Sequence, residues 1–308
     1  MVVDKIKTRI AVAMSTYNGE KYLPEQIESI LAQKDVYVEI YIRDDGSSDS
    51  TISILKKYEK DHANIHVSAG NNVGFARSFL TDLASITGFK YYAFSDQDDY
   101  WQEDKLISAI RMLEKSTRPA IYYSNLMDTD QDLNVRDTTR LQERKKTLES
   151  VTMRRSIAGC TMVMNNELKE LVCRRQFPAS LGPIGHDSFI MSLAYSVGAD
   201  ILFDENSYID YRQHSNNTTG ASGGAVNRIK KEIKFWHKLN GLESGLASFL
   251  LENYSDSITS DGKRILKEIE QSRKSFSGRM IVVFSPRYAT GNLALTLVGK
   301  LKAMVGRL

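Results

Sequence analysis

The segment RIAVAMSTYNGEKYL, residues 9–23, combines the two patterns on which the fold depends. The apolar run after Arg9 is typical of a buried strand, and the polar residues after Met14 end that strand. Pro24 then suits the first turn of a helix. One face of this helix is formed by four apolar residues at i, i+4, i+7 and i+8: Leu23, Ile27, Ile30 and Leu31.

The same alternation of strand and helix patterns continues to residue 124. Strands are predicted at residues 9–14, 38–43, 64–67, 90–95 and 120–124. Helical stripes follow at Ile52, Leu55 and Tyr58, and again at Leu106, Ile110 and Leu113. This order predicts an α/β fold with a mostly parallel sheet. The polar stretch 127–146 is expected to be a loop or a short surface insertion.

The composition of the 308 residues is that of an ordinary globular protein, with 42% apolar and 26% charged residues. It excludes collagen-like, low-complexity and wholly disordered chains. The net charge is +3, but residues 225–308 contain 15 basic and 7 acidic residues. The segment NNTTGASGGA, residues 216–225, is typical of a flexible connection at this change in charge. We therefore expect a first domain over residues 1–224 and a basic helical region over residues 225–308.

The cysteine content and the termini predict a protein of the cytoplasm. Cys160 and Cys173 are too few for a disulfide framework, and their spacing fits no zinc pattern. The N-terminal residues lack the uninterrupted apolar core of a signal peptide. The longest uncharged stretch near the C-terminus, residues 288–299, holds 12 residues. A membrane-spanning helix needs about 20.

The basic C-terminal region predicts an anionic partner, either a membrane surface or a nucleic acid. Residues 287–308 combine four basic residues with Leu, Val and Met and contain no acid, which is compatible with a helix at the membrane interface. A solvated basic face on a helix packed against the core gives the same pattern, and the sequence leaves both open. No nucleic-acid reader motif accompanies the charge, so we expect no nucleic-acid partner.

Polar residues follow three of the predicted strands at the point where each strand ends. These segments are residues 15–19, 44–49 and 96–99. Because ligands of open α/β sheets bind at the carboxyl ends of the strands, we expect the three segments to share one edge of the sheet. Each segment by itself would also fit a helix cap or a turn. Their combination favours a binding site.

The carboxylates around Asp96 predict a bound divalent cation. Crowded carboxylates repel one another unless a cation lies among them, and oxygen ligands suit Mg²⁺ or Mn²⁺. A calcium EF-hand is excluded because Trp101 stands where that loop needs glycine. A phosphatase of the Asp-x-Asp-Gly type is excluded because Arg43 stands where it needs an acid.

The order and spacing of seven motifs resemble the GT-A glycosyltransferases of family 2. The motifs are STYNGEKYL (15–23), RDDGSSDST (43–51), NNVGFARS (71–78), SDQDDYW (95–101), AGCTMVMNN (158–166), GHDSF (185–189) and YRQHSNN (211–217). SDQDDYW and YRQHSNN are most similar to bacterial rhamnosyltransferase-like enzymes of surface polysaccharide synthesis. The resemblance implies a GT-A, Rossmann-like fold: a mixed, mostly parallel central sheet flanked by helices, with a helical C-terminal extension. It also implies a donor half at about 1–124 and an acceptor half at about 125–224.

Position by position, the resemblance implies a site for a nucleotide-diphosphate sugar. Ser15, Tyr17 and Asp45 would hold the nucleobase. Arg77 would reach the base or the diphosphate, and Asp96 would bind the ribose or a metal-bound water.

The resemblance also implies a metal ligand, a general base and diphosphate contacts. Asp98 would be the direct ligand of the metal, and Asp187 would be the base that deprotonates the acceptor. A cap on the helix that begins near Ser188 is the structural alternative for Asp187, and both roles can coexist. Arg212 and His214 would contact the diphosphate, with His214 as a further metal ligand or a purely structural residue.

Two residues near these motifs keep open alternatives. Trp101 would line the acceptor pocket or pack in the core. Cys160 is expected to be a small packing residue and not a nucleophile.

These expectations describe an inverting, metal-dependent hexosyltransferase that moves L-rhamnose from dTDP-rhamnose to a glycan or lipid-linked acceptor. The basic region 225–308 would place it at the inner face of the cell membrane. Three alternatives stay open: a UDP-hexose donor, a nucleotidyltransferase, and a non-catalytic subunit that binds nucleotide sugars. The nucleotidyltransferase lacks support, because STYNGEKYL has neither the glycine spacing nor the early basic residue of a phosphate loop.

Overall fold

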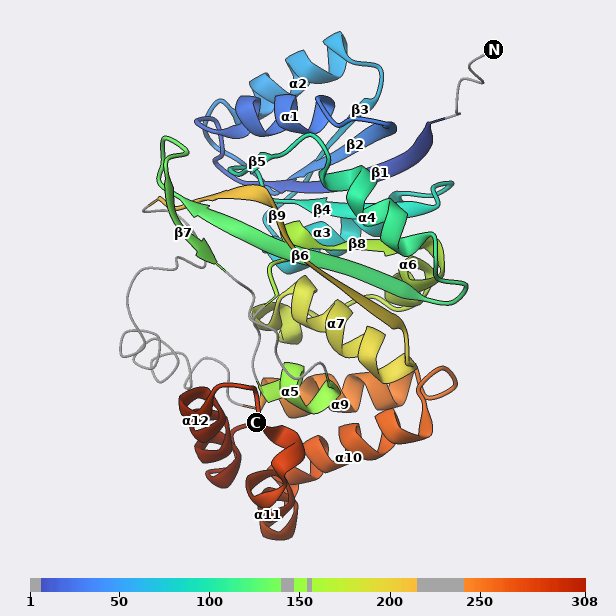
Figure 1. Ribbon diagram of the computed structural model, residues 1–308, viewed down its shortest axis with the longest axis vertical. Helices are drawn as coiled ribbons and strands as arrows, with labels where there is room; N and C mark the ends of the chain where they lie inside the picture. The colour runs from blue at the N-terminus through green and yellow to red at the C-terminus, as the bar shows by residue number, and fades with distance from the viewer. Residues whose placement is uncertain (1–6, 140–146, 154–156, 215–240) are drawn as a thin grey trace. The chain divides into compact units, whose positions relative to one another are not determined.

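The computed structural model describes residues 7–139, 147–153, 157–214 and 241–308, drawn as ribbons in Figure 1. The chain forms two compact units. The sheet unit consists of Met1–Arg140, Ala158–Arg174 and Asp200–Asn217. The helical unit consists of Leu141–Ile157, Arg175–Ala199 and Thr218–Leu308. The predicted domain boundary at residue 224 lies outside the described residues, so the division into 1–224 and 225–308 stays a prediction.

The described residues of the sheet unit form one nine-stranded sheet. Its strands are β1 (Thr8–Thr16), β2 (Val36–Asp44), β3 (Ile65–Ala69), β4 (Tyr91–Ser95), β5 (Tyr100–Trp101), β6 (Ala120–Thr129), β7 (Val135–Thr139), β8 (Val163–Asn165) and β9 (Asp200–Arg212). The order is β3-β2-β1-β4-β8-β6-β9-β5, with β7 paired to β6. The pairs among β1 to β4 are parallel, as is β6 with β9, and β8 joins the two groups with antiparallel pairs.

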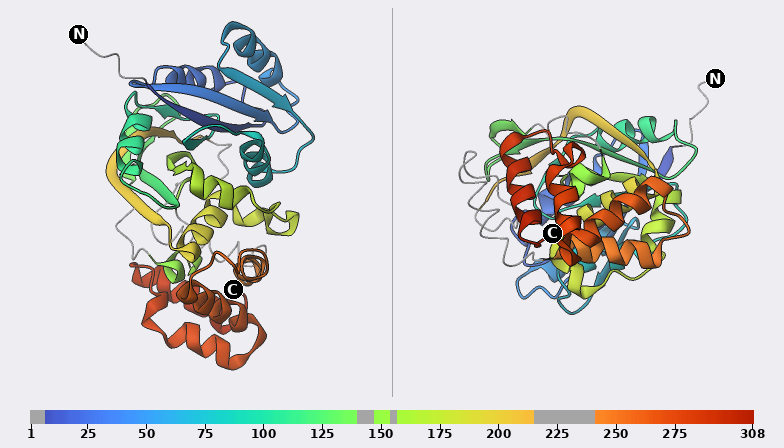
Figure 2. Two further views of the ribbon diagram at one scale, coloured as in Figure 1. Left: turned by 90° about the vertical axis from the view of Figure 1, so that its right-hand side faces the viewer. Right: turned by 90° about the horizontal axis from the view of Figure 1, so that it is seen from below.

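Helices cover both faces of this sheet (Figures 1 and 2). They are α1 (Leu23–Leu31), α2 (Thr51–Asp61), α3 (Phe75–Ser85), α4 (Lys105–Leu113) and α6 (Asn166–Cys173). Alternate residues of β1, Ile10 and Val12 among them, share one core with the apolar stripes of α1, α2 and α4. Phe79 of α3 packs edge-on against Phe94 of β4, with 5.8 Å between ring centroids. The period-2 strands and period-3.6 helices therefore match the expected layers.

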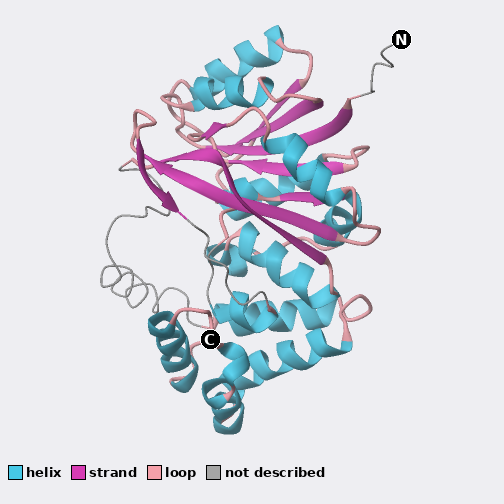
Figure 3. Cartoon of the chain, viewed as in Figure 1, coloured by secondary structure: helices cyan, strands magenta, loops and turns pink. Residues whose placement is uncertain are grey.

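The helical unit contains the six helices of its described residues (Figure 3). They are α5 (Leu148–Met153), α7 (His186–Val197), α9 (Leu242–Asn253), α10 (Ser260–Lys274), α11 (Phe276–Phe284) and α12 (Leu293–Met304). Side-chain caps start three of them: Thr259 before α10, Ser275 before α11 and Asn292 before α12. In the described parts of the chain, every helix is too short or too polar to cross a bilayer.

The predicted α/β class, with a mixed, mostly parallel sheet and a helical C-terminal extension, is confirmed. Residues 127–146 were expected to be a loop or a short surface insertion, and the loop alternative is wrong in the described part. β6 continues to Thr129, and Val135–Thr139 returns beside it as β7. The polar composition concealed this hairpin because backbone hydrogen bonds, which residues of any polarity form, pair the two strands.

Asp82 of α3 generates a prediction about stability and pH. Its side chain is 5% exposed, its Oδ2 atom lacks a hydrogen-bond partner among the described residues, and burial raises its pKa to about 7. An unfolded aspartate ionises near pH 3.8. The stability associated with the neutral carboxyl is therefore complete below pH 3.8 and is lost as the pH rises toward 7.

We expect Asp82→Asn to leave the melting temperature almost unchanged at pH 4 and to raise it at pH 8. The corresponding gain in the free energy of unfolding at pH 8 is on the order of 2–4 kcal/mol. Calorimetry at pH 4, 6 and 8 measures the difference. Asp61→Asn, at an exposed position of α2, is the matched control. An Asp82→Asn offset that is the same at all three pH values contradicts the prediction.

Candidate active site

Three loops meet at one edge of the sheet because β1, β2 and β4 are neighbouring parallel strands. In the register of the sheet, Thr16 pairs with Asp44 and Met14 pairs with Ser95. The strands therefore end level with one another. The loops that follow them, residues 15–19, 44–49 and 96–99, lie side by side as the sequence predicts.

The first of these loops is held from both sides. The Tyr17 backbone N–H donates to Gln97 Oε1 at 2.9 Å, and Gln97 Nε2 donates to the Tyr17 carbonyl at 3.1 Å. On the other side, the Ser48 backbone N–H donates to Asn18 Oδ1 at 2.8 Å. A Cβ on Gly19 would lie 2.3 Å from Gln97 Oε1, so a side chain there would displace the Gln97 amide that holds Tyr17.

The residues predicted to hold the nucleobase lie at this edge. Tyr17 is 50% exposed, which leaves its ring open for stacking. Ser15 donates from Oγ to Ser78 Oγ at 2.6 Å. Arg77 is the third residue of α3 and is half-buried.

Asp45 is buried, with 2% of its surface exposed, and the protein already supplies partners for its carboxylate. Arg43 donates to one oxygen, and the backbone N–H groups of Val73 and Gly74 each donate at 2.9 Å. Asp45 thereby ties the loop before α3 to the end of β2. Its contact with a nucleobase stays a prediction.

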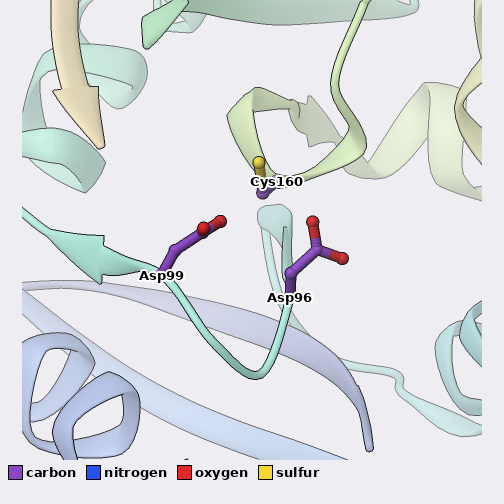
Figure 4. A group of neighbouring side chains, drawn as sticks. All are labelled: Asp96, Asp99 and Cys160. Carbon is purple, nitrogen blue, oxygen red and sulfur yellow. The ribbon is translucent and has the colours of Figure 1, made fainter. Parts of the chain in front are cut away.

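Asp96, Asp99 and Cys160 form a compact group, with one ligand atom from each within 4.8 Å of the others (Figure 4). Cys160 belongs to the 3₁₀ turn η1 (Gly159–Thr161), and the two aspartates belong to the loop after β4. Burial raises the pKa of Asp99 well above its ordinary value, and the charges of Asp98 and Asp96 add to this shift. Burial also raises the pKa of the Cys160 thiol.

The carboxylate oxygens of Asp96 and Asp99 are the ligand type that Mg²⁺ or Mn²⁺ prefers, whereas a thiol is not. A cation bound here would displace the proton that burial favours on Asp99. The high pKa of Cys160 also agrees with the expectation that this residue is not a nucleophile.

Asp98 and His214 form a second pair at the edge of the sheet. Asp98 Oδ2 lies 2.9 Å from His214 Nε2, and both side chains remain partly exposed. The His214 ring also packs against Tyr22, with 5.0 Å between centroids. The structure thus brings together the two residues expected to ligate a metal, although they are 116 positions apart in the chain. A carboxylate oxygen and an imidazole nitrogen at a partly open position fit a divalent cation.

Arg212 organises this region from a buried position. It is 2% exposed, and its guanidinium donates to the Asp98 carbonyl at 2.9 Å, to the Gln131 carbonyl and to Glu25. Its backbone N–H donates to Asp99 Oδ1 at 3.2 Å. Arg212 therefore fixes the loop that carries Asp98. Its predicted contact with the diphosphate is not tested by these bonds and stays a prediction.

Sequence reasoning missed Lys105, the first residue of α4, which lies against the Trp101 ring. Lys105 is fully buried at the start of α4, and its Nζ lies 3.6 Å from the centre of the Trp101 ring. Burial lowers the pKa of Lys105 to about 7. Trp101 is also fully buried, so it packs in the core. A lysine on a helix is usually solvated, and only the packing around α4 distinguishes this one.

Asp187 lies in the helical unit, in the first turn of α7. It is half-buried, and its Oδ1 accepts a hydrogen bond from the Ser188 backbone N–H at 2.7 Å. A negative charge is favourable there because of the helix dipole. The preceding His186 is 4% exposed, and burial lowers its pKa to about 3, so it is neutral. The helix begins at His186 with Gly185 at its N-cap and without a side-chain cap bond, so Asp187 is not the cap residue. Its role as a base stays a prediction.

Comparison with known sequences identifies the family. Residues 11–168 match the family model described as Glycosyl transferase family 2. The chain is 31% identical over 228 residues to the dTDP-rhamnosyl transferase RfbG of Shigella flexneri, covering 68% of this chain and 74% of RfbG. It is 33% identical over 164 residues to TuaG of Bacillus subtilis, which is named for teichuronic acid biosynthesis. That match covers 51% of this chain and 62% of TuaG.

Comparison with solved structures agrees on the fold. The crystal structure of residues 1–349 of S. aureus TarS in complex with UDP-GlcNAc superposes with a TM-score of 0.60 and 18% sequence identity. The alignment covers 96% of this chain and 79% of the TarS chain. With a family match that spans half the chain and a relative above 30% identity over two thirds of it, the chain belongs to glycosyl transferase family 2 and has the GT-A fold.

Proposed function

We propose that the protein is an inverting, metal-dependent hexosyltransferase that moves L-rhamnose from dTDP-rhamnose to a glycan or lipid-linked acceptor in surface polysaccharide synthesis. The observation that carries this proposal is the Asp98–His214 pair at the edge of the sheet where the loop of the exposed Tyr17 also lies. The similarity to RfbG supports rhamnose and dTDP. The UDP-GlcNAc complex of TarS supports a nucleotide-sugar donor of some kind.

The donor would bind along the edge where β1, β2 and β4 end. Tyr17 would stack on the base, and Ser15 and Asp45 would select it by hydrogen bonds. A thymine or uracil base offers an imide N–H that a carboxylate accepts. Arg77 would reach the base or the diphosphate from the start of α3, and Asp96 would bind the ribose or a metal-bound water.

Asp98 and His214 would hold Mg²⁺ or Mn²⁺. When bound, the cation supplies positive charge that offsets the negative charge developing on the departing nucleotide diphosphate. Arg212 would keep Asp98 in place through the loop contacts described above, and it and His214 would approach the diphosphate.

Asp187 would accept the proton of the acceptor hydroxyl as that oxygen attacks the anomeric carbon. Attack from the side opposite the leaving group gives inversion at that carbon. Such a general base typically accelerates the reaction by about 10²–10⁴-fold.

The same proposal places the enzyme in the cytoplasm at the inner face of the cell membrane, where a lipid-linked acceptor would lie. The basic C-terminal region, residues 225–308, would make the membrane contact. A UDP-hexose donor is the second candidate, favoured by the TarS complex. A nucleotidyltransferase and a non-catalytic sugar-nucleotide subunit are distinguished by the variants below.

The donor is identified by thermal unfolding with dTDP-, UDP- and GDP-sugars, each with and without Mn²⁺ or Mg²⁺. We expect the largest stabilisation with dTDP-rhamnose and metal, about 2.7 kcal/mol at 100 times its dissociation constant. A larger shift with a UDP-sugar supports the second candidate. No shift with any donor contradicts the proposal.

The metal site is tested by Asp98→Asn. We expect this variant to lose at least tenfold in metal affinity, because the substitution removes a charged ligand. Isothermal titration with Mn²⁺ in the presence of dTDP measures this affinity. Asp104→Asn, which removes an equal charge at the exposed start of α4, is the matched control. Equal metal affinity in both variants places the metal elsewhere.

The base is tested by Asp187→Asn. We expect unchanged donor affinity and a fall in transfer rate of about 10²–10⁴-fold, because the amide cannot accept the proton. Glu252→Gln, an exposed position on α9, is the control for the loss of a charge. Single-turnover transfer to a lipid-linked acceptor extract measures the rate. A transfer rate in Asp187→Asn within twofold of the control refutes this assignment.

A further inference from the structure

The apolar side of α12 faces away from the helical unit. Within this helix every exposed residue is apolar: Leu293, Ala294, Leu297, Leu301 and Met304. The exposed fractions of its three exposed leucines are 77%, 54% and 52%. The buried residues of the same helix are small or polar: Thr296, Gly299, Lys302 and Ala303. This polarity is the reverse of that expected for a helix packed on a water-soluble core.

Specific contacts hold α12 in this orientation. Lys302 Nζ donates to Glu243 Oε1 of α9 at 2.6 Å, and both side chains are about nine-tenths buried. A Cβ on Gly299 would lie 2.7 Å from the Met153 side chain, so the helix packs closely there. A rotation of α12 that hid its leucines would move Lys302 away from Glu243. Glu243 would then be a buried charge without its cation, which is costly. The outward leucines are thus part of the folded arrangement.

The neighbouring helix α11 also carries exposed apolar side chains. Phe276, Ile281 and Phe284 are 72%, 46% and 75% exposed, and α11 packs against α12. We call the exposed apolar residues of the two helices the α11–α12 face. Contiguous exposed patches of large apolar side chains are unusual on monomeric proteins and mark interaction sites.

The charge around this face selects its partner. Residues 276–308 contain five basic residues and no acid. Arg287 and Lys302 are paired with glutamates inside the unit. Lys300 follows Leu297 by three residues and lies on the same side of the helix. Its Nζ donates to the Ser285 carbonyl at 3.2 Å, a neutral acceptor that leaves the positive charge of Lys300 in place. A second copy of the chain would bring the same cationic surface opposite, whereas anionic lipid headgroups complement it.

We propose that the α11–α12 face inserts its leucines and phenylalanines into the acyl boundary of an anionic membrane leaflet, with Lys300 at headgroup level. Such a mode is that of an amphipathic helix lying in the plane of the interface. The inference deepens the membrane contact of the proposed function and rests on that function for its biological setting. It differs from a purely electrostatic tail, because apolar insertion provides most of the binding.

The test is flotation of the full chain with vesicles of phosphatidylglycerol or of phosphatidylcholine. We expect binding to phosphatidylglycerol that survives 0.5 M salt in large part, since insertion is not screened. The triple variant Leu293→Gln, Leu297→Gln and Leu301→Gln should lose at least tenfold in partitioning. The matched control is Tyr37→Gln with Val135→Gln, which removes exposed apolar side chains from the sheet unit.

Binding of the triple variant equal to that of the native chain overturns the proposal, as does a native chain that stays unbound. Light scattering without vesicles gives the third outcome: a native dimer that the triple variant converts to a monomer assigns the face to a second copy and also overturns it. Thermal stabilisation by dTDP with Mn²⁺, measured on the same preparations, separates the two proposals. A native chain that dTDP with Mn²⁺ does not stabilise but that still binds vesicles through its leucines contradicts the donor site and leaves the membrane proposal supported.

Discussion

The crowding of carboxylates at the edge where β1, β2 and β4 end is the constraint to which the sheet unit is adapted. Asp96, Asp98 and Asp99 lie in the one loop after β4, and the charges of Asp98 and Asp96 raise the pKa of Asp99, so their repulsion must be offset. The structure treats each acid at this edge differently. Asp45, after β2, has Arg43 and two backbone N–H groups, Asp99 is buried with a raised pKa, and Asp98 lies against His214. Asp96 and Asp98 are the partly exposed acids of the loop, where the proposed cation would bind.

Distant segments complete this edge. β9 ends at Arg212, whose backbone N–H reaches Asp99 and whose guanidinium reaches the carbonyl of Asp98. His214 follows two residues later and meets the Asp98 carboxylate. The end of β9 thus supplies Arg212, which supports the acidic loop, and His214, whose imidazole is the proposed second ligand. The hydrogen bonds of Arg212 hold the backbone of this loop, while the side chains of Asp98 and His214 stay partly exposed to solvent. This arrangement suits a charged ligand that binds from solvent.

The helical unit also buries charged side chains, while apolar side chains are exposed on its surface. Its interior includes the Lys302–Glu243 ion pair, and the buried Tyr288 donates to Glu268, which also pairs with the half-exposed Arg287. Its outer surface at α11 and α12 carries phenylalanine and leucine. Buried ion pairs add little net stability but are costly to break singly, so they fix one packing of the helices over others. That packing is what presents the apolar face.

The sequence by itself determined the strands β1 to β4 and β6, the helices α1, α2 and α4, and the polar segments at the strand ends, but not β5, β7, β8 or β9. These follow from periods of 2 and 3.6 residues and from local turn chemistry, which act over a few residues. The motifs also indicated the family, with Asp98 as an expected metal ligand and His214 as either a ligand or a structural residue. Only the tertiary structure decided which acids are buried, that Arg212 is an internal support, that Lys105 lies under Trp101, and that the leucines of α12 face outward. Burial, pKa and helix rotation depend on contacts between residues far apart in the chain, and no local pattern records them.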